Sequence, residues 1–457
     1  MTAAGRPQPA PPRPYHFPPF ERATLGNGMR LVVAPMRALP IVTVTIALDA
    51  GAMTEPAGQD GIASLTARAL LEGTTRLDAS ELSEQLERLG ATVAADADWD
   101  AAVVSVTVLR ERLEAALALL AEIVRSPAFP DGDVERLKME RLAEIMQSRA
   151  EPRGLADEVF SRAVYVPGSR YARPGRGTAH SVSGFTRAEL AAFHAARFRP
   201  GGATMILAGD VSAAAAERLA ASCFGDLAGG APPAVPLDDA PARGTRALHL
   251  APRADAPQSE IRIGHVGLPR AHPDYFPVLV MNAILGGLFS SRINLNLREK
   301  HAYTYFAFSG YDWRRGAGPF CASTAVQSDV TAAAAREILA EIDAMRAAPP
   351  KADEIELATS YLAGVFPIKY ETTDAVASAL AAMAVYGLPH DYFDVYRDRV
   401  RGVTAESVRR AAEEHLHPGA LQLAVVGDVS SIRAPLEALT FGPIVTYDRD
   451  GEPVGST

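Results

Sequence analysis

Two histidines close together in the chain, His415 and His417 in EEHLHP, have side chains that could bind a metal ion. Histidines that share one ion on a helix normally stand at i and i+4, because that spacing brings both rings to the same face. His415 and His417 stand at i and i+2, so we interpret them as surface or helix-end residues. The other histidines that we considered are isolated in the sequence and are interpreted in the same way: His180, His194, His301 and His390.

Other residue types that support chemistry are also poorly spaced for it. Cys223 and Cys321 lie far apart, which is typical neither of a disulfide framework nor of a cysteine-based zinc site. The glycine-rich segment LGGLFSS, at 285–291, lacks the Lys-Ser/Thr pair of a phosphate-binding loop, and we interpret it as a helix break. GLFSSR is not a nucleophile elbow. The formal net charge of −9 argues against a nucleic-acid-binding protein.

The N-terminal segment is rich in proline and lacks the apolar region of a signal peptide. We therefore predict an extended lead-in over residues 1–20. The sequence shows no run of about 18 apolar residues, so we expect no transmembrane helix. We expect a cytoplasmic protein, or a periplasmic one if a leader has been removed.

An internal repeat organises the elements that must position any functional residue. The segment TRAELAAFHAARFRPGGATMILAGDVS begins at Thr186, and TAESVRRAAEEHLHPGALQLAVVGDVS begins at Thr404. The proline and the Gly-Asp-Val-Ser ending keep one constant offset between the two segments. Collinear matches at a constant offset predict a tandem duplication of a unit of about 200 residues.

Each unit alternates strand-like and helix-like segments. IVTVTIALDAG, at 41–51, alternates like a strand, and LDASELSEQLERLG, at 77–90, has a capping box and an apolar face like a helix. Such alternation predicts α+β layers, with helices packed on a sheet. We predict an N-terminal domain over 21–227, a linker rich in proline, glycine and alanine over 228–246, and a C-terminal domain over 247–445.

The sequence resembles the pitrilysin-type (M16) zinc peptidases, especially the short bacterial and mitochondrial-processing subfamily (M16B). The resemblance extends from about Arg22 to about Leu436 and rests on segments such as LGNGMRLVVAP, GTTRLDASELSEQLERLGA, SPAFPDGDVERLKMERLAEI and ILGGLFSSRINLNLREKHAYTY. It implies two homologous halves with the LuxS/MPP-like metallohydrolase fold, joined by the linker and facing each other across a cavity.

The resemblance also locates the zinc positions of the family, and most of them are lost. Members that cut peptides carry His-x-x-Glu-His on a helix and a distal Glu as the third ligand. The register of GIASLTARALLEGTT, at 61–75, places Ser64, Ala67 and Arg68 at the His, Glu and His positions. Glu144 stands at the position of the distal ligand. The resemblance therefore implies no zinc in this chain.

A second family feature is retained in LREKHAYTYF. The resemblance assigns Arg298 and Tyr305 to a pair that faces the zinc across the cavity and binds the substrate backbone. A guanidinium group can donate to peptide carbonyls, and a tyrosine hydroxyl can donate to a carbonyl or an oxyanion. Without the surrounding match, a surface arginine and a packed tyrosine would be the simpler interpretation. The family glycine of this segment is replaced, since the chain has His301, Ala302 and Tyr303 before Thr304.

We therefore predict a subunit that binds no zinc in a two-chain bacterial M16B peptidase. A partner with an intact zinc motif would supply the metal and the general base, and the isolated chain would be inactive. The substrate would be an unfolded peptide. The alternatives are an inactive homologue that serves as a structural core subunit, a peptide-binding chamber without catalysis, and a zinc enzyme with different ligands.

Overall fold

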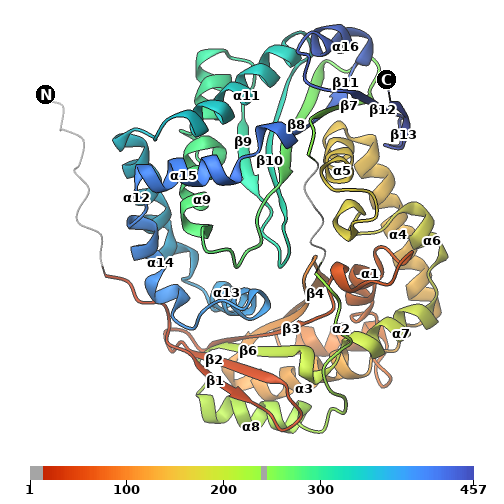
Figure 1. Cartoon of the computed structure of the whole chain (residues 1–457). Helices are drawn as coiled ribbons and strands as arrows, with labels where there is room; N and C mark the ends of the chain where they lie inside the picture. Colours follow the sequence, from red (N-terminus) through yellow and green to blue (C-terminus); the bar gives the residue numbers. More distant parts are fainter. Residues whose placement is uncertain (1–13, 238–243, 457) are drawn as a thin grey trace, which may run out of the picture.

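The computed structural model describes residues 14–237 and 244–456, which form two β-sheets with helices between and around them (Figure 1). The first sheet has the order β1 (Glu21–Thr24), β2 (Arg30–Pro35), β6 (Ala203–Gly209), β3 (Ile41–Leu48), β5 (Ala102–Leu109), β4 (Thr92–Ala97). The second has the order β13 (Pro453–Ser456), β12 (Ile444–Tyr447), β7 (Ala247–Pro252), β11 (Gln422–Gly427), β8 (Gln258–Val266), β10 (Pro319–Gln327), β9 (Ala307–Tyr311). Residues 1–13 of the predicted lead-in and 238–243 of the predicted linker lie outside the described residues.

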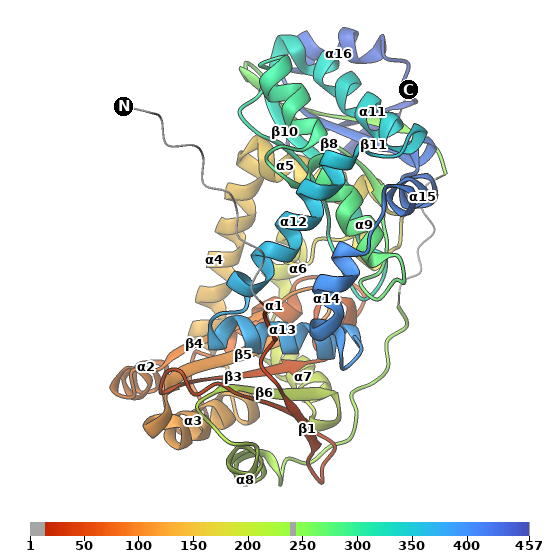
Figure 2. The ribbon, with the colours of Figure 1, turned by 90° about the vertical axis from the view of Figure 1, so that its left-hand side faces the viewer.

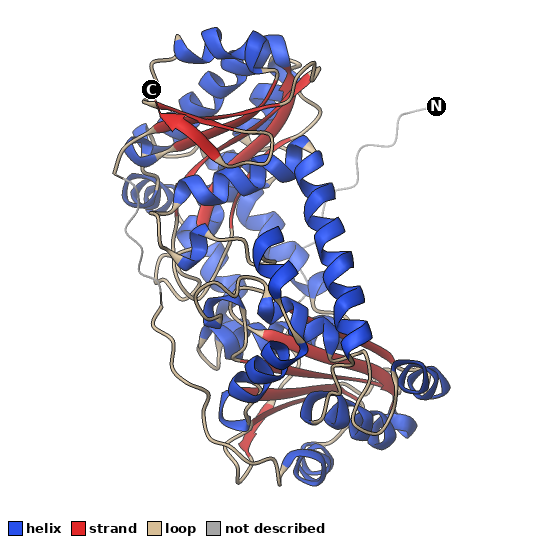
Figure 3. Cartoon of the chain, turned by 90° about the vertical axis from the view of Figure 1, so that its right-hand side faces the viewer, coloured by secondary structure: helices blue, strands red, loops and turns tan. Residues whose placement is uncertain are grey.

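Five strands of each sheet share one topology, β2-β6-β3-β5-β4 in the first and β7-β11-β8-β10-β9 in the second, and the predicted duplication into two homologous α+β halves is confirmed. In the first sheet, β6 is parallel to β2 and antiparallel to β3. In the second, β11 is parallel to β7 and antiparallel to β8. β6 and β11 are the strands that end the two sequence repeats. Figure 3 shows the sheets at opposite ends of the molecule, with helices between them.

Most helices pack on the sheet of their own half. The first half contains α1 (Ile62–Ala69), α2 (Ala79–Arg88), α3 (Leu113–Arg125), α4 (Asp131–Ala150), α6 (Ala179–Gly184), α7 (Arg187–Arg197) and α8 (Ala213–Phe224). The second contains α9 (Tyr275–Asn282), α10 (Arg292–Asn294), α11 (Thr331–Ala347), α12 (Ala352–Lys369), α14 (Tyr392–Arg401), α15 (Ala405–His415) and α16 (Val429–Glu437). The long helices α4 and α12 run between the two ends of the molecule (Figure 2).

Two helices are exchanged between the halves. α5 (Pro152–Val164) comes from the first half but packs on β8 and β11 of the second sheet. Conversely, α13 (Thr373–Tyr386) packs on β3 and β6 of the first sheet. Val159 of α5 and Leu380 of α13 are fully buried in these two contacts. Each sheet therefore needs a helix from the other half to cover one face.

One helical stretch in the described part of the chain, Tyr275–Lys300, is long and apolar enough to cross a membrane by length and composition alone. The sequence analysis did not anticipate it, because no continuous apolar run marks it. Half of its most apolar window is buried inside the protein. Val278, Leu285 and Leu297 of this stretch belong to the core of the second half. We interpret the stretch as a core helix.

Candidate functional site

Helix α1, which carries Ser64, Ala67 and Arg68, begins with an unusual N-terminal cap. Gly61 precedes the helix with φ of +93°, and an added Cβ would lie 2.6 Å from the Arg176 carbonyl, so the position requires glycine. The carboxylate of Glu55 accepts hydrogen bonds from the backbone N–H groups of Gly61 and Ala63, at 3.1 and 3.0 Å. Arg170 forms an ion pair with the same carboxylate. This cap fixes α1 against the loop that contains Arg176.

An ion-pair network connects three of the four positions that the resemblance relates to the zinc site of the family. Arg68 Nη1 lies 2.8 Å from Glu144 Oε1, and Arg141 Nε lies 3.1 Å from Glu144 Oε2. Arg141 Nη1 also donates to Ser64 Oγ at 3.0 Å. Ala67 is fully buried and contributes no polar atom. The structure thus brings Ser64, Arg68 and Glu144 together. The guanidinium groups of Arg68 and Arg141 connect them.

The arginines of this network stabilise the ionised form of Glu144. Burial alone would raise the pKa of Glu144, but the hydrogen bond from Arg68 and the charges of Arg141, Arg68 and Arg176 hold that pKa below its ordinary value. Burial lowers the pKa of the Arg141 guanidinium, and Glu144 opposes that shift. A zinc ion needs several lone-pair donors, whereas Arg68 and Arg141 offer only N–H groups. The residues present do not fit zinc.

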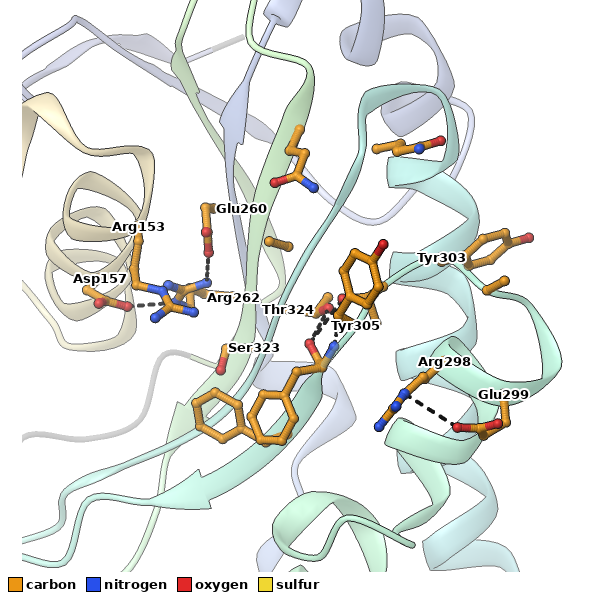
Figure 4. A pocket seen from close by; sticks show the side chains of 17 residues that line it. Arg153, Asp157, Glu260, Arg262, Arg298, Glu299, Tyr303, Tyr305, Ser323 and Thr324 are labelled. Atoms are coloured by element: carbon orange, nitrogen blue, oxygen red, sulfur yellow. Dashed lines mark hydrogen bonds and ion pairs between the residues drawn. The ribbon is translucent and has the colours of Figure 1, made fainter.

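The predicted pair of the second half lines a separate cavity of about 810 Å³ (Figure 4). Arg298 comes from a short π-helix, η6 (Leu295–Lys300), and its guanidinium group lies over the ring of Phe289, at 4.5 Å from the ring centre. Its carboxylate contact is Glu299, at 3.4 Å. Tyr305 follows on the segment that leads into β9, and 91% of its surface is exposed. Both side chains line the cavity, and the guanidinium group of Arg298 and the hydroxyl of Tyr305 do not hydrogen-bond to each other.

The opposite wall of this cavity comes from the exchanged helix α5. Figure 4 shows Arg153 and Asp157 of α5 across the cavity from Arg298 and Tyr305, beside Arg262 of β8. Arg262 Nε donates to Asp157 Oδ1 at 2.6 Å. These residues could not be predicted, because nothing in the sequence shows that α5 crosses to the second sheet. The helix exchange therefore contributes Arg153 and Asp157 to the cavity wall.

His415 belongs to one group of metal-compatible donors in the described residues, together with two residues that were not considered from the sequence. Atoms of His272, Asp274 and His415 lie within 4.8 Å of one another. His415 Nε2 and Asp274 Oδ2 are 2.8 Å apart, which joins the end of α15 to the start of α9. His272 Nδ1 accepts the backbone N–H of Asp274. His415 is the last residue of α15 and is buried, so of the two interpretations, surface or helix end, the structure supports the helix end. We interpret the group as a structural hydrogen-bond cluster.

Fold and site together define a class: duplicated α+β proteins with two similar sheets and an ion pair between Arg68 and Glu144 in the first half. The family described as "Insulinase (Peptidase family M16)" matches residues 32–180, and "Peptidase M16 inactive domain" matches residues 184–362. The chain belongs to the M16 peptidase family.

Relatives of known name and structure agree with this assignment. An uncharacterized zinc protease of Mycobacterium tuberculosis (strain ATCC 25618 / H37Rv) is 25% identical over 430 residues, which cover 90% of this chain and 94% of the relative. A probable mitochondrial-processing peptidase subunit beta of Schizosaccharomyces pombe is 27% identical over 278 residues, or 59% of each chain. The structure described as peptidase M16 inactive domain from Pseudomonas fluorescens has a TM-score of 0.84 and 27% identity, and covers 90% of this chain and 98% of that one. The matches to the inactive-domain family and to the inactive-domain structure support a non-catalytic M16 homologue.

Proposed function

We propose that the chain is the zinc-free subunit of a two-chain M16 peptidase and binds extended peptide through Arg298 and Tyr305. One contrast carries the proposal. At the former zinc position, Arg68 and Glu144 neutralise each other, whereas Arg298 and Tyr305 present their polar groups to an open cavity. Tyr305 does not serve core packing, because 91% of its surface is exposed, and it lies beside Arg298 in the cavity lining. A partner subunit with intact His-x-x-Glu-His would supply the zinc and the general base.

Free sheet edges favour an extended substrate. In the described residues, β9 pairs only with β10, and β4 pairs only with β5. An extended peptide can add a strand to such an edge, with its main chain supplying the hydrogen bonds. β9 begins directly after the segment with Tyr305, and β4 packs against α1. Both edges therefore lie near residues of the proposed or former sites.

The experiment is a cleavage assay on the two-chain complex, purified through a tag on this chain, with metal analysis of each subunit. We expect Arg298→Ala and Tyr305→Phe each to lower kcat/KM for an unfolded peptide by about 100-fold, because each removes a donor to the reacting peptide. Arg336→Ala on α11 and Tyr361→Phe on α12 are matched controls, because their side chains are exposed and lie outside the cavity lining. Both should leave kcat/KM unchanged.

The rival function is an inactive structural core subunit. It predicts a stable complex in which the Arg298 and Tyr305 variants assemble and behave like the wild type. Unchanged cleavage by both variants, or a tagged complex with no zinc-bearing peptidase, would favour that rival.

A further inference from the structure

A second cavity of about 300 Å³ lies beside the former zinc position, between α4, α5 and the loop at 172–177. We call it the basic cavity, because arginines dominate its lining: Arg141, Arg149, Arg162, Arg173, Arg176 and Arg314. Asp157 lines both this cavity and the one with Arg298 and Tyr305. A chain that crosses α5 could therefore occupy both.

The carboxylates in the lining of the basic cavity are already neutralised. Glu144 is bound by Arg68 and Arg141. Glu158 lies 2.6 Å from an Arg149 nitrogen, and Asp157 lies 2.6 Å from Arg262. Arg162, Arg173 and Arg314 pair with carboxylates outside the lining, namely Glu452, Asp60 and Asp312. Among the described residues, Arg176 is thus the lining arginine left without an ion pair.

Two arginines of the basic cavity retain unused donors. Arg314 is 5% exposed, and its guanidinium group lies over the rings of Trp99 and Tyr171, at 4.1 and 4.6 Å. Nε and Nη2 of Arg314 bind Asp312, but its Nη1 is buried with no hydrogen-bond partner among the described residues. Arg176 is exposed and forms no side-chain ion pair within the described part of the chain. A buried donor without a partner is costly, and an acceptor that enters the cavity would satisfy it.

We infer that the basic cavity binds a carboxylate of the peptide, either its C-terminus or an acidic side chain. The inference rests on the proposed function, which brings a peptide into the adjoining cavity. Guanidinium groups bind carboxylates through paired, charge-assisted hydrogen bonds, and Arg314 and Arg176 offer the free donors. Where the resemblance places a zinc ion, a cation, the adjoining basic cavity would therefore attract an anion.

The test compares three fluorescent peptides of one unfolded sequence without other acidic residues, using anisotropy and the full chain. The first ends in a free carboxylate, the second in an amide, and the third is amidated but carries one glutamate near its end. We expect the acid or the glutamate peptide, or both, to bind about tenfold more tightly than the neutral amide. Raising the salt concentration should reduce that ratio. The acid and glutamate arms distinguish the two sources of the carboxylate.

Arg176→Gln and Arg314→Gln should each bring the ratio of the affinities for the acidic and the neutral peptide towards one. Arg176 is exposed, so its replacement remains informative if Arg314→Gln fails to fold. Arg187→Gln on α7 is the control, because that side chain is exposed and lies outside both cavities. Equal affinity of the wild type for all three peptides would overturn the inference. If Arg298→Ala still weakened the binding of all three peptides in that case, the proposed function would stand. If the wild type bound none of the peptides, both the inference and the proposed function would be overturned.

Discussion

At the residue scale, Arg68 neutralises Glu144 through a contact of 2.8 Å. The register of GIASLTARALLEGTT relates Ser64, Arg68 and Glu144 through the family resemblance, and the structure brings these three residues into one network. Arg141 could not be predicted, because α4 carries charged residues around much of its surface, and the sequence does not show which of them points inward.

The ion pair of Glu144 can be tested by one substitution. Glu144→Gln leaves Arg68 and the buried Arg141 without their shared counter-charge, and we expect a loss of about 1 to 2 kcal/mol in the free energy of unfolding, since the pair is partly exposed. Glu140→Gln is the matched control on the same helix, because Glu140 lies 4.0 Å from Arg68 and its closer ion pair, with Arg136 at 2.7 Å, is solvent-exposed. It should change stability by less than about 0.5 kcal/mol. Urea unfolding measures both, and equal losses would contradict the special role of Glu144.

The same carboxylate gives that experiment a pH dependence. The folded-state pKa of Glu144 is below its ordinary value. Its contribution to stability is therefore present above the unfolded-state pKa and is lost as the pH falls through the folded-state pKa. The difference between wild type and Glu144→Gln should shrink in acid. A chelator should leave the unfolding midpoint of the wild type unchanged, because the donor set does not fit zinc.

At the scale of elements, the sequence predicts local structure better than packing partners. The segment at 77–90 predicted a helix with a capping box, and Asp78 and Glu81 form that box at the start of α2. The exchange of α5 and α13 was not predictable. An apolar helix face shows that the helix is buried, but not which of two similar sheets covers it. For the same reason, the wall formed by Arg153 and Asp157 was missed.

The turn from η6 into β9 carries a strained residue. Ala302 has φ of +54°, a left-handed conformation, and Tyr303 N–H donates to the Leu297 carbonyl at 2.8 Å across this turn. A non-glycine residue in this conformation costs about 1 to 2 kcal/mol, and the extra freedom of glycine in the unfolded chain offsets about 0.5 to 1 kcal/mol of the relief. We therefore expect Ala302→Gly to raise the free energy of unfolding by about 0.5 to 1 kcal/mol. Chemical denaturation of the purified variant measures the gain.

The control for this turn is an exposed alanine at another helix end. Ala348, after α11, has φ of −146°, an ordinary extended value. Ala348→Gly should give no gain, because glycine there only adds freedom to the unfolded chain. A similar gain in both variants, or a loss in Ala302→Gly, would show that the left-handed turn is not strained.

At the scale of the whole molecule, the helix exchange makes the two halves depend on each other. α13 covers one face of the first sheet, where Val32, Ala34 and Ile206 are buried, and α5 covers one face of the second. A fragment that ends at residue 237 would expose both the face that α13 covers and the apolar side of its own α5. We therefore expect fragments ending at 237 and beginning at 244 to be insoluble or unfolded when expressed separately.

Co-expression of the two fragments should restore a soluble one-to-one complex, because each supplies the helix that the other's sheet lacks. Leu380→Asp in α13 should prevent assembly, since this side chain is fully buried against the first sheet and an unpaired carboxylate there is costly. Ser378→Asp, at an exposed position of the same helix, should leave assembly intact. Size-exclusion chromatography and circular dichroism measure both results. Stable, separately folded fragments would contradict the interdependence, because each half would then bury its sheet without the exchanged helix.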